Sequence, residues 1–112
     1  KLEYVNVANN ELVDLPNLDK LVALNTLHCF SNELAFLPRF DSLKSLEVVQ
    51  AHNNKLTVTP SLPKTCRLKS LYLNNNNLDK LTDFSNSGFN KSALELLSIQ
   101  GFSVMVSIIC QD

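Results

Sequence analysis

The chain has 112 residues, 45% apolar and 19% charged, which suits one compact domain and excludes a disordered tail or a highly charged coiled coil. Its net charge of -1 argues against nucleic acid as a ligand, because phosphate binding requires a surplus of Lys and Arg on one face. With only two glycines there is no Gly-rich phosphate loop, so nucleotide cofactors are not expected either. The longest apolar stretch, 102–110, is far shorter than the roughly 20 residues of a membrane helix.

One motif, L-x-x-L-x-L-x-x-N-x-L with aliphatic substitutions, recurs along the chain. Its first four copies start at Leu2, Leu24, Leu46 and Leu68. The asparagine of each copy lies 22 residues after the previous one, at Asn10, Asn32, Asn54 and Asn76. A fifth copy starts at Leu94 after a stretched spacing of 26 residues, with Phe102 where the asparagine is expected. Because the chain begins at Lys1 inside a repeat, we expect a fragment of a longer protein.

The periodicity within each repeat predicts its local structure. In the strand segment, Leu71 and Leu73 alternate with Tyr72, so the leucines and the tyrosine face opposite sides. After the asparagine, leucines recur at every third residue from Leu12 to Leu27. On an α-helix each step of three falls about 60° short of a full turn, so the run would bury no continuous face. A 3-10 helix or extended segment keeps it on one side, and the longer segment 81–94 has room for a short helix.

The repeated asparagine predicts a buried ladder of side-chain amides. At the sharp turn after each strand, backbone groups face inward away from water, and an amide supplies both a donor and an acceptor to satisfy them. One repeat cannot bury its own apolar side chains, so stacking and a parallel hydrogen-bond ladder between strands are expected. The first repeat has no earlier repeat stacked against it in this sequence, and we expect Leu2, Val5 and Val7 to be partly exposed.

These residues resemble the leucine-rich repeat family over about residues 2–102. The resemblance implies an α/β fold, a leucine-rich repeat solenoid in the form of a right-handed superhelix, with a short parallel concave sheet and a convex side of 3-10 helix or coil. The predicted single domain, 1–112, comprises repeats near 2–23, 24–45, 46–67, 68–93 and 94–102, and a C-terminal capping strand, 102–110.

Two classes of that family compete for this sequence. The strict 22-residue spacing is similar to the repeats of eukaryotic phosphatase regulators and bacterial internalins. In contrast, Leu37-Pro38 and the run 54–63, which ends in the Pro-Ser-Leu-Pro segment 60–63, look like the L-P-x-L-P repeats of bacterial type III effectors. This sequence departs from them in having Thr59 in place of the usual leucine and a repeat that is two residues longer.

Alternate strand residues are expected to line the concave face, where a partner would bind. The candidate partner-binding residues are Tyr4, His28, Phe30, Val48, Gln50, His52, Tyr72 and Asn74. Large aromatics on a rigid sheet are typical of protein interfaces, and the face carries few formal charges. The alternative is that Phe30 and Val48 merely cover one another as cross-strand neighbours.

Neither the histidines nor the cysteines predict a metal, catalytic or cofactor site. His28 and His52 are about two positions out of step on adjacent strands, which places their Cβ atoms roughly 7 to 8 Å apart without a third ligand. A pH-sensitive contact is the remaining role for them. Cys29, Cys66 and Cys110 contain no C-x-x-C pair, which predicts reduced, buried thiols. Reduced thiols favour the cytoplasm, or a host cytoplasm for an effector.

The sequence therefore predicts a non-enzymatic module that recognises a protein partner on its concave face. The alternative is the substrate-recognition domain of a bacterial effector whose catalytic ubiquitin-ligase domain lies outside this fragment. A scaffold with no partner on that face is the third hypothesis. The sequence does not identify the partner.

Overall fold

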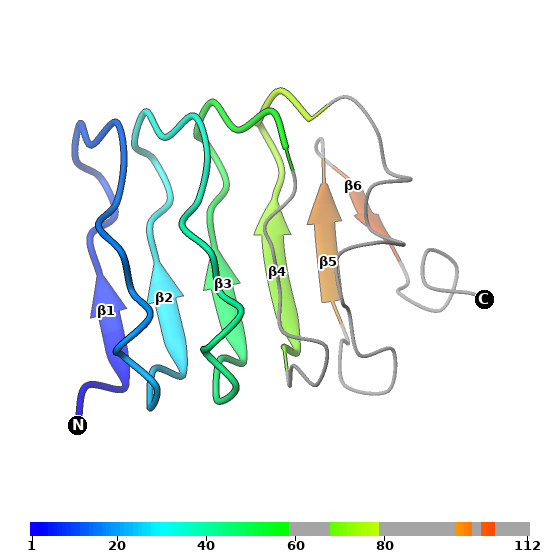
Figure 1. The fold of residues 1–112 in the computed structure, drawn as a ribbon. Coiled ribbons are helices and arrows are strands. Elements are labelled where there is room, and N and C mark those ends of the chain that lie inside the picture. Colours follow the sequence, from blue (N-terminus) through cyan, green and yellow to red (C-terminus); the bar gives the residue numbers. More distant parts are fainter. Residues whose placement is uncertain (59–67, 79–95, 100–101, 105–112) are drawn as a thin grey trace.

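A computed structural model describes residues 1–58, 68–78, 96–99 and 102–104. These residues contain no helix, and their strands form a single sheet in chain order (Figure 1). The strands are β1 (Tyr4–Asn6), β2 (Thr26–His28), β3 (Val48–Gln50), β4 (Ser70–Leu73), β5 (Leu96–Ile99) and β6 (Phe102–Val104). Strands β1 to β5 run parallel, as predicted, and β6 pairs antiparallel with β5.

The register of the sheet follows the period of the sequence. Val5 pairs with Leu27, Leu27 with Val49, and Val49 with Leu71, so equivalent residues of successive repeats lie side by side. The fifth copy keeps the same register although its spacing is stretched, because Leu71 pairs with Leu97 at the equivalent position of the motif. Each repeat therefore places the same position of its motif at the same height in the sheet.

The described part of the chain forms two layers. The sheet is one layer, and the segments that return from each strand to the next form the other; Figure 1 shows them in front of β1, β2 and β3. The apolar core lies between the layers. Its buried members are Leu18, Leu24, Leu27, Cys29, Leu34, Phe40, Leu43, Leu46, Val49, Ala51, Leu56, Leu68, Leu71 and Leu73.

Where the structure describes them, the return segments consist of bends and single turns and include no 3-10 helix, one of the two forms predicted for them. In the first return segment, the amide of Leu21 donates to the carbonyl of Leu18 at 2.9 Å, and that of Leu24 donates to Leu21 at 2.9 Å. These i to i+3 bonds recur every three residues. They keep the leucines on the inner side as a 3-10 helix would, without continuous helical hydrogen bonding.

Three of the four repeated asparagines lie buried and join adjacent repeats. Asn54 accepts the amide of Leu34 at 3.0 Å through Oδ1. Its Nδ2 donates to the carbonyls of Cys29 and Ala51, both at 3.1 Å, so one side chain holds the backbones of two repeats. Asn32 and Asn76 make the equivalent bonds.

Asn10 is an exception, because a buried position was predicted for all four asparagines and Asn10 is exposed. Its Nδ2 donates only to the carbonyls of Val7 and Ala8 within its own repeat. The described residues contain no earlier repeat to cover it or to give its Oδ1 an amide. The same end of the sheet leaves Leu2 exposed and Val5 half-buried, as expected for an uncovered first repeat.

Several predicted features lie outside the described residues. These are the short helix at 81–94, most of the capping strand 102–110, the segment 60–63, and two of the three cysteines, Cys66 and Cys110.

Candidate binding face

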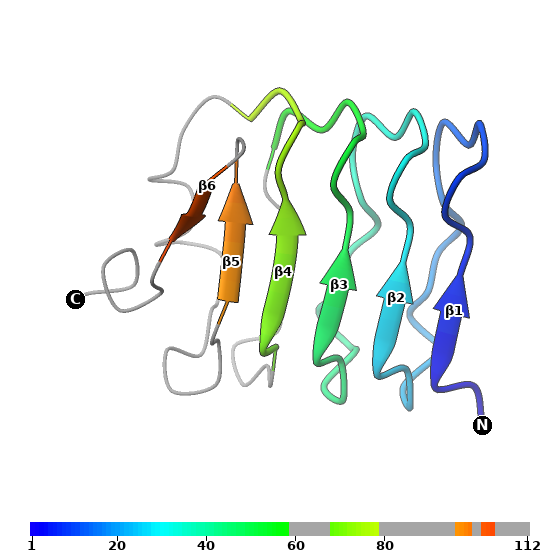
Figure 2. The ribbon, with the colours of Figure 1, turned by 180° about the vertical axis from the view of Figure 1, so that it is seen from behind.

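The sheet has one face that the return segments leave uncovered, and Figure 2 views the molecule from that side. We call it the open face. Its side chains alternate with buried core residues along each repeat, because successive side chains of a strand point to opposite sides. The open face comprises Tyr4, Asn6, Thr26, His28, Phe30, Val48, Gln50, His52, Ser70, Tyr72 and Asn74.

Five aromatic rings run across the open face in unbroken contact, and we call them the aromatic row. Centroid distances are 5.3 Å from Tyr4 to His28 and 5.9 Å from His28 to Phe30. They are 4.6 Å from Phe30 to His52 and 5.7 Å from His52 to Tyr72. The row crosses the first four repeats, and all five residues belong to the predicted partner-binding set.

The contact proposed from sequence between Phe30 and Val48 is wrong. Val48 pairs with Thr26, at the start of β2, whereas Phe30 lies two residues beyond the end of that strand. The residue beside Phe30 is His52, whose ring is stacked at 9° from parallel. Because equivalent positions of successive repeats align, Phe30 lies beside the residue 22 positions later, which is His52. Val48 lies four residues before His52 and therefore cannot be the neighbour of Phe30.

The remaining predicted residues lie around this row. Gln50 pairs with His28 on one side and with Tyr72 on the other, in the middle of the face. Val48 lies half-buried at the beginning of β3, and Asn74 lies half-buried just beyond β4. The predicted partner-binding set therefore occupies one continuous surface across four repeats.

A hydrogen-bonded group fixes one end of the aromatic row. The hydroxyl of Tyr4 lies 3.1 Å from Nδ1 of His28, and Nδ2 of Asn6 donates to that hydroxyl at 3.4 Å. Oδ1 of Asn6 in turn accepts the amide of Ala8 at 3.0 Å. Tyr4 is thus oriented from two strands, although 48% of its surface is exposed.

His52 occupies a less polar position in the middle of the row. Its Nδ1 is covered and has no hydrogen-bond partner, the sole buried side-chain polar atom of this kind in the described part of the chain. Burial lowers the pKa of His52 from 6.5, and the charge of a protonated His28 lowers it further. The imidazole is therefore neutral near pH 7.

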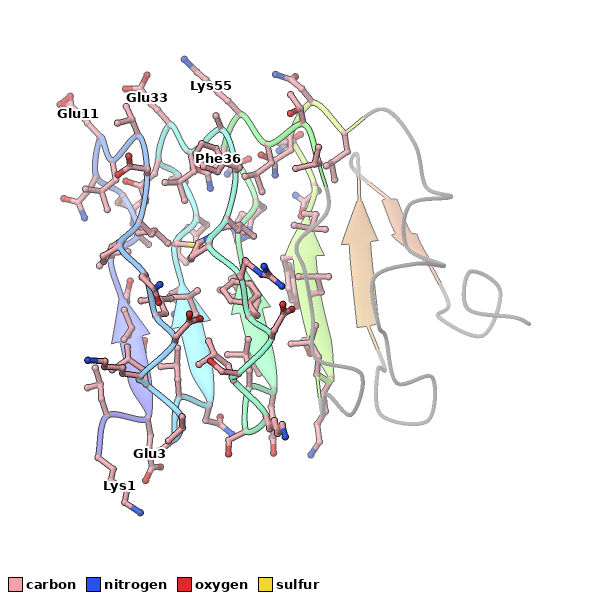
Figure 3. The ribbon with its side chains drawn as sticks, in the orientation of Figure 1. Lys1, Glu3, Glu11, Glu33, Phe36 and Lys55 are labelled. Carbon is pink, nitrogen blue, oxygen red and sulfur yellow. The ribbon has the colours of Figure 1, made fainter. Side chains whose placement is uncertain are left out.

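The open face carries no Asp, Glu, Lys or Arg among its residues. Formal charges lie outside this face. Figure 3 shows Glu11, Glu33 and Lys55 beyond one end of the strands, and Lys1 and Glu3 beyond the other. The ion pair between Lys55 and Glu33, at 3.2 Å, is solvent-exposed and contributes little to stability.

Sequence reasoning missed the role of the residue that precedes each repeated asparagine. Asn9, Ser31, Asn53 and Asn75 have positive φ angles of 60°, 56°, 57° and 57°. Asparagine tolerates this left-handed conformation better than most residues, so the doublets Asn9-Asn10, Asn53-Asn54 and Asn75-Asn76 were the available signal. The turn directs the next side chain inward, and Asn75 Nδ2 also donates to Asn53 Oδ1 at 2.7 Å.

The described residues offer little for metal or thiol chemistry. They contain no group of three or more His, Cys, Asp or Glu side chains placed to hold a metal ion. Burial raises the pKa of the Cys29 thiol to about 12, so the thiolate is scarce at neutral pH. Nor does any helix in the described ranges have the length and apolar character needed to cross a membrane.

No protein-family model matches the chain, and a search of curated proteins found no match to its sequence.

Proposed function

We propose that this chain is a leucine-rich repeat solenoid, a right-handed superhelix, that binds a protein partner on the open face of its sheet without catalysing a reaction. Support for the fold comes from the 22-residue register of the parallel strands and from the asparagines that bond backbones of adjacent repeats. The open face would be the concave surface of the solenoid.

The single observation that carries the function is the aromatic row. Five rings in contact lie on a sheet whose backbone is fixed by hydrogen bonds between repeats, so little conformational entropy is lost when a partner covers them. Tyr is among the residues enriched at binding hot spots, which contribute about 2 kcal/mol or more each. The lack of formal charge on the face favours a partner held by packing and neutral hydrogen bonds.

Affinity capture with matched variants tests this proposal. The double variant Phe30→Ala, Tyr72→Ala removes two rings of the row. We expect it to lose at least tenfold in affinity for the captured partner, about 1.4 kcal/mol. Phe36→Ala is the matched control, since Phe36 is a phenylalanine with 57% exposure outside the open face (Figure 3). Equal capture by the wild type and the double variant would contradict the proposal.

A further inference from the structure

The tautomers of His28 and His52 determine which ring nitrogen of each histidine offers a hydrogen-bond donor to a ligand on the open face. Asn6 donates to the Tyr4 hydroxyl, which lies 3.1 Å from Nδ1 of His28. Because the hydroxyl oxygen already accepts from Asn6, we assign its hydrogen to the bond with Nδ1 of His28. Nδ1 of His28 then accepts a hydrogen bond, which leaves its proton on Nε2 in the neutral ring. His28 consequently presents an Nε2–H group as a donor.

His52 reaches the same tautomer for a different reason. Its Nδ1 is covered and unpartnered. A buried N–H without an acceptor is rarer in proteins than a buried acceptor without a donor. We therefore assign the unprotonated nitrogen of His52 to Nδ1 and the proton to Nε2. Nε2 of His52 is not among the covered, unpartnered atoms. Both imidazoles therefore present an N–H donor, and no described protein group accepts from either.

Phe30 lies between these two donors. Its ring centroid is 5.9 Å from that of His28 and 4.6 Å from that of His52. The centre of the open face is thus a flat apolar ring flanked by two N–H donors, with no carboxylate, ammonium or guanidinium group among the described residues of the face. A ligand complementary to this centre is uncharged and places an apolar group between two hydrogen-bond acceptors.

We propose that the open face binds a proline-rich segment of a partner protein in the polyproline II conformation. Proline has no backbone N–H, and the carbonyls of this helix make no internal hydrogen bonds, so the segment supplies acceptors and apolar rings without unsatisfied donors. Aromatic-lined surfaces bind such segments because the helix is preformed and loses little entropy. In the proposed complex a proline ring packs on Phe30, and carbonyls on either side of it accept from His28 and His52, whose ring centroids lie 5.9 and 4.6 Å from that of Phe30.

This proposal rests on the proposed function, because it names the chemistry of the partner for the same face. The titratable and charged groups that face His52 in the described residues are His28 and Tyr72, and Tyr4 faces His28. No acidic residue of the open face competes with a ligand carbonyl for the two donors. An acidic segment would instead require protonated histidines, and burial disfavours protonation of His52.

The first test is titration of the full chain with an N-acetylated, C-amidated decaproline peptide, followed by NMR of amide and histidine ring signals. We expect saturable shifts at His28, Phe30 and His52 and at least fivefold weaker binding to Phe30→Ala. Phe36→Ala should bind as the wild type does, and a Gly-Ser decamer with the same end groups should not bind. Absence of shifts with decaproline at millimolar concentration, or equal binding by Phe30→Ala, overturns the proposal.

A second measurement tests the donor assignment without any ligand. Two-bond nitrogen–proton correlations of the histidine rings at neutral pH should report the Nε2–H tautomer for both His28 and His52. His52→Phe keeps a ring on Phe30 but removes the donor, and we expect it to bind decaproline several-fold more weakly while its amide spectrum stays folded. An Nδ1–H tautomer at His52, or unchanged binding by this variant, contradicts the assignment.

The two proposals fail in distinguishable ways. If the partner captured through Phe30 and Tyr72 contains no proline-rich segment and decaproline does not bind, the ligand chemistry is wrong and the binding face stands. If capture itself does not depend on these rings, the proposed function fails.

Discussion

The imidazole of His52 stacks on the phenyl ring of Phe30, with centroids 4.6 Å apart and planes 9° from parallel. Phe30 and His52 each lie two residues beyond the end of their strand. The residues that precede them, Cys29 and Ala51, are fully buried in the core. A stacked aromatic pair contributes about 0.5 to 1.5 kcal/mol beyond the area it buries. The stack therefore joins two adjacent repeats and forms the centre of the proposed binding surface, so the folded state of each variant must be measured alongside binding.

The pH dependence of stability should report the environment of His52. Its pKa is lowered from 6.5 by burial first and by His28 second. As pH falls through 6.5, the unfolded chain takes up a proton at this residue that the folded chain does not, so the free energy of unfolding decreases. The decrease from this residue ends once pH passes below the folded pKa.

Urea unfolding at a series of pH values from about 8 to about 5 measures this effect. His52→Phe should show a shallower loss of stability over that range than the wild type, because one differential protonation is removed. Identical pH profiles for the two proteins would show that His52 titrates alike in the folded and unfolded states.

The asparagine ladder predicts unequal effects from the same substitution. Asn54→Ala removes the acceptor of the buried Leu34 amide. It also removes one of the two asparagine donors to each of the carbonyls of Cys29 and Ala51, which keep their bonds from Asn32 and Asn76. We expect a loss of about 1 to 3 kcal/mol in the free energy of unfolding. Asn10→Ala is the matched control. Because Asn10 is exposed, we expect this substitution to lower the free energy of unfolding by less than about 0.5 kcal/mol. Chemical denaturation measures both, and equal losses would refute the ladder.

The left-handed turn at Ser31 gives a prediction of increased stability. Its φ of 56° is the conformation that Asn9, Asn53 and Asn75 adopt in the other repeats. Asparagine enters this region at lower energy than serine, so Ser31→Asn should raise the free energy of unfolding by about 0.5 to 1 kcal/mol. The reverse change, Asn9→Ser, should lower it by a similar amount. A destabilising Ser31→Asn, measured by thermal or urea unfolding, would mean that the turn does not select for asparagine.

The buried thiol of Cys29 predicts slow chemical modification. Burial raises its pKa to about 12 and removes it from solvent, so an aromatic disulfide reagent should react with it only through opening of the fold. A Cys66→Ser, Cys110→Ser variant isolates this thiol. Its reaction near pH 8 should be far slower in buffer than in urea. Equal rates in the two conditions would place Cys29 at the surface.

The pattern of repeats predicted the parallel strands because a two-residue period and a 22-residue phase together fix which residues pair. Leu27 and Val49 align in the sheet as their places in the motif require. The inward-pointing asparagines were predictable for the same reason, since their amides satisfy the backbone of a turn that every repeat shares. Asn10 differs because burial depends on a preceding repeat, which its own motif does not specify.

The neighbour of Phe30 was also predictable, because the 22-residue phase places His52 beside it, and the pairing of Phe30 with Val48 departed from that phase. Other features depend on contacts that the motif does not encode. The covered Nδ1 of His52 follows from ring packing in three dimensions. The three-residue period of the return segment predicted its inner face, but that period did not distinguish a 3-10 helix from separate turns.

Site-specific photo-crosslinking can show whether a partner binds on the open face. A photoreactive phenylalanine analogue would replace Tyr72 on the face in one protein and Phe36 outside it in another, each mixed with the partner identified by capture. We expect a crosslinked complex from position 72, competed by unlabelled wild-type chain, and none from position 36. Crosslinking from position 36 but not from position 72 would contradict it.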